Sequence, residues 1–212
     1  MPQCLVRPML ASVAALLLGS SALQRVAPAI GQLAVDERIG ALLRPGMQLV
    51  YESGGVGATW TLDSVAHDTT LGGRAGCVRM RVRTAADQAV PEVRAYCRDA
   101  TTMFAWDERT GTHRPSRPLR GGDSLRSPQR NGGSALYETA AAIEEMIGAR
   151  TITVVPTTVT TRDSTGTPVR RLRERFSIGL ATATGGVFEE RDLTQPGGWR
   201  IARSFELTLI RD

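Results

Sequence analysis

The sequence predicts an all-β protein: a curved antiparallel sheet, shaped as a half-barrel or open barrel, preceded by a short N-terminal helix. From residue 47 onward, apolar and polar residues alternate with the period of two that is typical of β-strands. Turn sequences rich in glycine, proline and aspartate divide this part of the chain into about eight or more strand-length runs. Between residues 179 and 185, one strand face carries only glycine and alanine, so the sheet can bend sharply there.

Residues 1–29 have the composition of a secretory signal peptide. Arg7 precedes a short apolar run, and small residues beyond that run allow cleavage after Ala22 or Ala29. The run is shorter than the ~20 residues that span a bilayer, and an uncleaved N-terminal anchor is the alternative interpretation. Residues 30–212 are expected to form one exported β domain, periplasmic or secreted, with no transmembrane span.

The first element of this domain is predicted to be an amphipathic helix over residues 30–43, because apolar residues recur there at helical spacing. A Pro-Gly pair ends it. Two strands follow, over residues 47–53 and 58–65. The glycines at 54 and 55 lie between them and indicate a hairpin turn.

Cys77 and Cys97 are predicted to form a disulfide bond. They lie in two strand-like runs whose connection is centred on Asp87, so a hairpin folded there places them directly opposite each other. Directly opposed Cα atoms of antiparallel strands lie about 4.5–5.5 Å apart, which a disulfide can bridge. An even number of cysteines in an exported domain favours such a bond. Two reduced buried cysteines are the alternative, whereas a redox pair would need the closer CxxC spacing.

Two segments in the middle of the chain depart from the simple strand pattern. Residues 112–134 are rich in proline, glycine, serine and arginine, and are predicted to form a long flexible loop. Residues 136–147 are ambiguous between helix and strand, because alanine, glutamate and methionine favour helix while β-branched residues follow. Further strands are expected over residues 151–162, 168–184 and 199–210, with a turn over residues 163–166.

One charged pair stands out from the alternation in the last third of the chain. Glu174 shares a strand face with large apolar side chains such as Phe176. Arg203 interrupts the apolar face of the final strand in the same way. Because an unpaired buried charge is costly, Glu174 and Arg203 are predicted to form a partly buried ion pair. The arginines on the opposite face are interpreted as a solvated stripe.

The sequence carries no motif that assigns catalysis. His67 and His113 lack the spacing of metal ligands, and no GxSxG nucleophile elbow is present. We therefore assign no catalytic residue, metal or cofactor and expect a non-enzymatic protein; a hydrolase that uses either histidine is the remote alternative. Without residues 1–29 the chain has 24 arginines against 21 acidic residues, a formal charge of +3 that is too small to predict a nucleic-acid partner.

The C-terminal third, residues 135–210, is similar to a bacterial family of exported proteins that share a domain of unknown function. The similarity lies in "YETAAAIEEMIGARTITVV" and in "RLRERFSIGLATATGGVFEERDL", the latter at Arg175, Phe176, Gly179, Leu180 and Gly186. It implies a curved half-barrel like that of the lipoprotein-localisation factors. It also implies a hairpin with its turn at Gly148, which favours strands over residues 136–147. That family has no established catalytic residues, so the resemblance assigns none.

The leading functional hypothesis is a non-enzymatic cell-envelope protein that binds an apolar ligand or lipid on the concave face of the sheet. The candidate residues of the groove are Trp60, Leu62, Phe176, Ile178, Phe205 and Leu207. The alternative is a structural or protein-interaction module whose core is filled and whose partner is an envelope protein.

Overall fold

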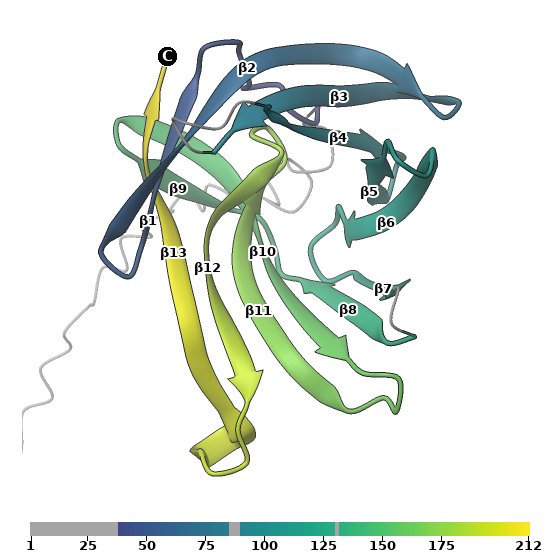
Figure 1. The fold of residues 1–212 in the computed structure, drawn as a ribbon, viewed down its shortest axis with the longest axis vertical. Coiled ribbons are helices and arrows are strands. Elements are labelled where there is room, and N and C mark those ends of the chain that lie inside the picture. The colour runs from purple at the N-terminus through teal and green to yellow at the C-terminus, as the bar shows by residue number, and fades with distance from the viewer. Residues whose placement is uncertain (1–37, 85–89, 130–131) are drawn as a thin grey trace, which may run out of the picture.

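Figure 1 shows the computed structural model, which describes residues 38–84, 90–129 and 132–212. These residues form one antiparallel sheet of 13 strands and a single 3-10 turn, η1 (Pro196–Gly198). The strands are β1 (Gln48–Ser53), β2 (Val56–Leu71), β3 (Arg74–Arg83), β4 (Glu92–Arg98), β5 (Thr102–Asp107), β6 (Thr112–Pro118), β7 (Ser124–Pro128), β8 (Ser134–Thr139), β9 (Ile143–Ile147), β10 (Arg150–Arg162), β11 (Pro168–Ser177), β12 (Thr182–Arg191) and β13 (Trp199–Arg211). The all-β prediction is confirmed. The predicted signal peptide lies outside the described residues.

The sheet curves into a nearly closed barrel, as Figure 1 shows. Its strand order is β6-β5-β4-β3-β2-β1-β13-β12-β11-β10-β8-β7, and β9 pairs with β10 off this path. Strands adjacent in sequence are mostly adjacent in the sheet, and the pairing of β1 with β13 joins the first strand to the last. The two end strands, β6 and β7, lie side by side and form what we call the seam of the barrel.

The predicted N-terminal helix is wrong for the part that the structure describes. Residues 38–46 form turns, and the backbone N–H groups of Gly40 and Leu42 donate to carbonyls of the turn between β11 and β12, each at 2.9 Å. Gly40 has a φ of 71°, which a helix does not permit, and a Cβ there would lie 2.7 Å from Cγ2 of Val78. Ile39 and Leu43 are buried in the core without being helical, whereas Leu42 is exposed. Residues 30–37 lie outside the described residues.

The predicted loop over residues 112–134 is also wrong, because it contains β6 and β7. Proline cannot donate to a strand ladder, so the prolines of this segment argued against strands. The structure resolves the conflict by placing both strands at the ends of the sheet. β6 carries Pro115 and Pro118, and β7 ends on Pro128. An end strand has one edge without ladder hydrogen bonds, where a missing N–H costs little.

The ambiguous segment over residues 136–147 contains two strands joined by residues 140–142, and no helix. It covers the end of β8 and all of β9, both of which pair with β10. Gly148 occupies the turn between β9 and β10 with a φ of 59°, the position that the family resemblance implied. Pairing with β10 outweighs the helix propensity of the alanine and glutamate residues.

The run over residues 168–184 is a hairpin, whereas the sequence predicted one strand. β11 ends at Ser177, residues 178–181 form a tight turn, and β12 begins at Thr182. Ala181 in this turn has a φ of 48°, which is uncommon for a residue with a Cβ. This turn contains neither proline nor aspartate, and the alternation of large and small residues continues through it. The sequence pattern therefore did not indicate that the chain reverses direction here.

The barrel interior holds one apolar core, built mainly from β1, β2, β3, β10, the β11–β12 turn and residues 39–47. Its largest fully buried side chains include Leu43, Met47, Leu62, Met103, Leu119, Ile178 and Leu180. Four of the six predicted groove residues, Leu62, Phe176, Ile178 and Leu207, belong to this core and are at most 2% exposed. Most of the predicted groove is therefore filled by its own side chains.

Candidate functional site

An open cleft lies between β1, β2, β12 and β13 and has a volume of about 390 Å³. Its lining consists of Tyr51, Ser53, Ala58, Trp60, Thr182, Ala183, Phe188, Arg203 and Phe205. Trp60 and Phe205 are thus the two predicted groove residues that line a cleft. Sequence reasoning missed Phe188, although its place two residues after Gly186 on an alternating strand puts it on the same face.

Aromatic rings form a continuous wall in this cleft. The ring centroids of Tyr51 and Trp60 are 4.6 Å apart, those of Tyr51 and Phe205 are 6.3 Å apart, and those of Phe188 and Phe205 are 5.8 Å apart. Phe205 lies opposite Gly186 in the β12–β13 pairing, and a Cβ on that glycine would lie 2.9 Å from Cε1 of the ring. The small residue in β12 therefore makes room for the ring.

Tyr51 anchors the floor of the cleft. Its hydroxyl donates to the carbonyl of Ala183 at 3.0 Å and lies 3.2 Å from Oγ1 of Thr182. Burial raises the pKa of the Tyr51 phenol well above its ordinary value, so the hydroxyl remains a neutral donor. These contacts join β1 to β12 across the cleft and leave Trp60, Phe188 and Phe205 partly exposed above them.

Two arginines flank the aromatic wall. The guanidinium of Arg94 lies 4.2 Å from the ring centroid of Trp60 and pairs with Glu92 at 2.8 Å. The guanidinium of Arg203 lies 4.1 Å from the centroid of the Phe188 ring. A guanidinium over an aromatic face is stabilised by the ring quadrupole. Glu92 compensates the charge of Arg94, so the positive charge at the cleft is that of Arg203, while the wall is apolar.

A larger depression, of about 510 Å³, is a poorer candidate for a ligand site. Charged side chains from β10 to β13 contribute much of its lining, including Arg175 and Glu206, which pair with each other. Arg175 also pairs with Glu145 at 2.8 Å. Arg175 is therefore compensated by two carboxylates, and Phe205 is the one aromatic residue in this lining, so the depression suits an apolar ligand less well than the aromatic cleft.

The arginines on the other face of β11 are paired rather than free. Glu189 on β12 accepts from Arg171 at 2.5 Å and from Arg173 at 2.9 Å, and its side chain is buried. These contacts correct the interpretation of a purely solvated stripe, because a carboxylate of the neighbouring strand neutralises part of it. The hydrogen bond from Arg171, with the charges of both arginines, lowers the pKa of Glu189.

Replacement of Glu189 by Gln should reduce the free energy of unfolding at neutral pH by about 1–2 kcal/mol, since charged hydrogen bonds are lost. The folded-state pKa of Glu189 lies below its ordinary value of 4.5. The carboxylate therefore stabilises the fold fully above that value, and this contribution disappears as the pH falls through the folded-state pKa. Urea unfolding of both proteins between pH 7 and 3 checks this. A difference that stays constant across this pH range would contradict it. Glu190→Gln is the control, since the Glu190 side chain is 45% exposed and its pair with Arg200 is the longer one, at 3.5 Å.

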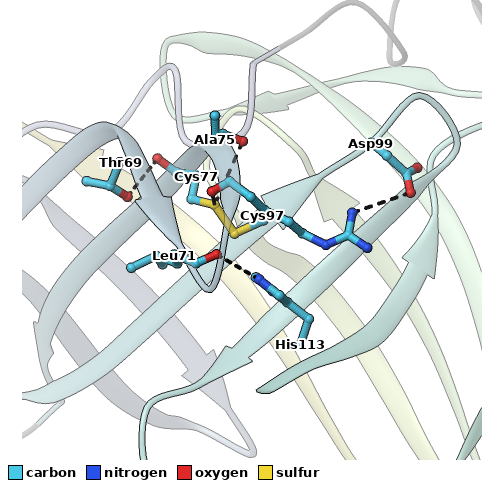
Figure 2. The surroundings of a disulfide bond; sticks show 8 residues. Thr69, Leu71, Ala75, Cys77, Cys97, Asp99 and His113 are labelled. Carbon is cyan, nitrogen blue, oxygen red and sulfur yellow. Dashed lines mark hydrogen bonds and ion pairs between the residues drawn. A yellow bond between two sulfur atoms is a disulfide. The ribbon is translucent and has the colours of Figure 1, made fainter. Parts of the chain in front are cut away.

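The disulfide prediction is confirmed. Figure 2 shows the bond between Cys77 on β3 and Cys97 on β4, whose Cα atoms are 4.1 Å apart. The strand register pairs Val78 with Tyr96, which places the two cysteines directly opposite each other, as the hairpin centred on Asp87 predicted. Both sulfurs are buried, so the bond is structural rather than exposed to exchange.

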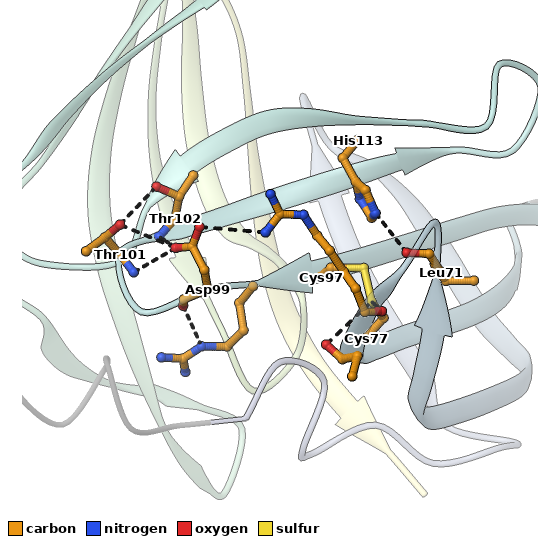
Figure 3. A network of polar contacts seen from close by, with 10 residues as sticks. Leu71, Cys77, Cys97, Asp99, Thr101, Thr102 and His113 are labelled. Carbon is orange, nitrogen blue, oxygen red and sulfur yellow. Dashed lines mark hydrogen bonds and ion pairs between the residues drawn. A yellow bond between two sulfur atoms is a disulfide. The ribbon is translucent and has the colours of Figure 1, made fainter.

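Both histidines make hydrogen bonds to backbone carbonyls. His67 lies 3.3 Å from the carbonyl of Leu43. Figure 3 shows His113 directed at the carbonyl of Leu71; the ring nitrogen and the carbonyl oxygen are 2.9 Å apart, and the tilted ring of Trp106 packs against His113 with centroids 4.7 Å apart. Among the described residues, no group of three His, Cys, Asp or Glu side chains could hold a metal ion. The other ring nitrogen of His113, Nδ1, is buried and has no hydrogen-bond partner in the part of the chain that the structure describes.

The structure does not bring Glu174 and Arg203 together. Glu174 is buried, as predicted, but its partner is Arg117 on β6, at 2.6 Å. Arg203 points to the cleft, over Phe188. Arg117 was missed because it lies in the segment that was predicted to be a loop. The pair reaches from the seam strand β6 across the barrel interior to β11.

The fold and the cleft together define a barrel-like all-β protein with an aromatic cleft on one side of its core. No protein-family model matches the chain, and no curated protein or solved structure is significantly similar to it. The resemblance of the C-terminal third to the localisation-factor-like family therefore stays a prediction. Within the described part of the chain, no helix is long and apolar enough to cross a membrane.

Proposed function

We propose that this protein is an exported, non-enzymatic component of the cell envelope that binds an apolar ligand or lipid in the aromatic cleft. One observation carries the proposal: Trp60, Phe188 and Phe205 remain partly exposed in a cleft beside a core that is otherwise filled. Ligand sites are typically concave and apolar with few polar groups. The wall of this cleft has that composition.

Export is supported by two features of the chain. The N-terminal residues have the order of charge, apolar run and small residues found in secretory signal peptides. A buried disulfide favours an oxidising compartment such as the periplasm or the exterior. Protein recovered from outside the cytoplasm should begin directly after Ala22 or Ala29, whereas an intact N-terminus would favour a retained anchor.

A structural or protein-interaction role is the second candidate. It is favoured by the burial of Leu62, Phe176, Ile178 and Leu207, because a filled core leaves the cleft as a shallow site rather than a deep cavity. A partner segment could then occupy the same aromatic wall. The two functions predict different results with a small apolar molecule: a ligand-binding protein binds it in the cleft, whereas an interaction module does not.

The test is titration of the purified mature protein with N-phenyl-1-naphthylamine, an uncharged apolar probe whose fluorescence rises when it leaves water. We expect saturable binding by the wild type. Phe205→Ala should weaken it by about tenfold, because an aromatic contact of ~1.4 kcal/mol is lost. Ile201→Ala is the matched control: Ile201 lies on the same strand, is 63% exposed and does not line the cleft.

A result without saturable binding would reject the small-ligand function and favour the interaction module. Equal weakening by Phe205→Ala and Ile201→Ala would place the binding outside the cleft. Thermal unfolding of each variant must accompany the titration, because Phe205 also packs against the core. Only variants that remain folded at the temperature of the titration are compared.

A further inference from the structure

Arg203 is the one charged residue in the lining of the aromatic cleft. The other lining residues are aromatic, alanine, serine or threonine, so the described lining contains no carboxylate. The side chain of Arg203 is exposed. In the described part of the chain, the guanidinium of Arg203 makes no ion pair, and its one aromatic contact is with the ring of Phe188.

The neighbouring arginines, in contrast, are paired with carboxylates. Arg171 and Arg173 share Glu189, and Arg94 at the opposite end of the aromatic wall pairs with Glu92. Arg200, three residues before Arg203 on β13, pairs with Glu190 at 3.5 Å. Among the described residues no carboxylate lies within ion-pair distance of Arg203, so the cleft retains one uncompensated positive charge.

The position of this charge suits an anion that enters the cleft. Arg203 and Phe188 are direct partners across β12 and β13, and the central carbon of the guanidinium lies over the Phe188 ring, 4.1 Å from its centroid. This contact leaves the N–H groups at the edge of the guanidinium, where they can bind a carboxylate or phosphate through two parallel hydrogen bonds.

We infer that the ligand of the cleft is an amphiphilic anion: an apolar body against Trp60, Tyr51 and Phe205, with one acidic group on Arg203. This inference rests on the proposed function, since it specifies the ligand of the same site. A single uncompensated guanidinium matches a single negative charge, and the absence of lining carboxylates removes the repulsion that would exclude it.

The test uses two probes with the same aromatic body. N-phenyl-1-naphthylamine is uncharged, and 1-anilinonaphthalene-8-sulfonate is the same molecule with a sulfonate. Arg203→Gln should weaken binding of the sulfonate by about tenfold, because a charge-assisted contact is lost, and should change the affinity for the neutral probe by less than about twofold. Arg200→Gln, on the same strand but outside the lining, is the matched control and should leave both affinities unchanged.

Each outcome separates the inference from the function on which it rests. If neither probe binds the wild type, the proposed function fails. If the neutral probe binds and Arg203→Gln leaves the sulfonate affinity unchanged, the function stands and the anionic ligand is rejected. Displacement of the neutral probe by dodecanoate or dodecyl phosphate, but not by dodecan-1-ol, would support the inference and show which acid is preferred. Displacement by the alcohol as strongly as by both acids would overturn it.

Discussion

Replacement of Glu174 by Leu will destabilise the fold by about 3 kcal/mol, because it leaves the guanidinium of Arg117 buried without its counter-charge. The side chains of Arg117 and Glu174 are 13% and 7% exposed, and their charged atoms are 2.6 Å apart. The same guanidinium lies 3.5 Å from the ring centroid of Phe176. Loss of the carboxylate therefore affects a contact that links the seam strand β6 to the core.

The matched double variant should recover much of this loss. Nε of Arg117 is buried and has no hydrogen-bond partner, so the ion pair is incompletely satisfied. Apolar groups of similar size can replace such a pair at little cost. We expect Arg117→Met combined with Glu174→Leu to be more stable than Glu174→Leu alone, as measured by urea unfolding.

A surface ion pair provides the control for this experiment. Arg79 and Glu108 are paired at 2.5 Å, but their side chains are 36% and 40% exposed. Glu108→Leu should cost less than about 1 kcal/mol, because water screens the pair. If Glu174→Leu costs no more than Glu108→Leu, the barrel does not depend on the Arg117–Glu174 contact.

Replacement of both Cys77 and Cys97 by Ala will reduce the free energy of unfolding by about 3 kcal/mol. The bond closes a loop with a sequence separation of 20 residues, and in the chain-entropy model a loop of that size restricts the unfolded chain by about this amount. Alanine is preferred over serine because both positions are buried, where an unpaired hydroxyl is costly.

Chemical reduction of the disulfide in the wild type should lower the free energy of unfolding by the same amount. Thermal unfolding with and without a thiol reductant checks this, and the double variant should no longer respond to the reductant. The register of β3 and β4 places the two cysteines opposite each other without the bond, so the variant should keep its fold. An unchanged unfolding temperature in both experiments would mean that the bond does not stabilise the protein.

Much of the fold could be predicted because local patterns agree with it. The alternation of apolar and polar residues in β1 to β5 predicted the hairpins. The equal spacing of Cys77 and Cys97 from Asp87 predicted the strand register that brings the two cysteines together. The glycines between β1 and β2 marked that turn. In each case the deciding contact is between neighbouring strands, so the sequence pattern contains the information.

The errors arose where a distant contact decides the structure. β6 and β7 tolerate proline only because they end the sheet, which a local pattern does not show. The partner of Glu174 was missed for the same reason, since Arg117 lies 57 residues earlier in the chain. The alternation identified Trp60 and Phe205 as apolar and inward-facing, but it could not separate them from Leu62 and Phe176, which the closed barrel buries.

The central claim is that an apolar ligand binds at the aromatic cleft. The chain has three tryptophans, and only Trp60 lines that cleft. Trp106 packs on His113, and the ring of Trp199 contacts the guanidinium groups of Arg171 and Arg191. In ¹H–¹⁵N spectra of the mature protein titrated with 1-naphthol, the indole resonance of Trp60 should shift and saturate while those of Trp106 and Trp199 stay in place. Binding that shifts Trp106 or Trp199 and leaves Trp60 unmoved would contradict the account.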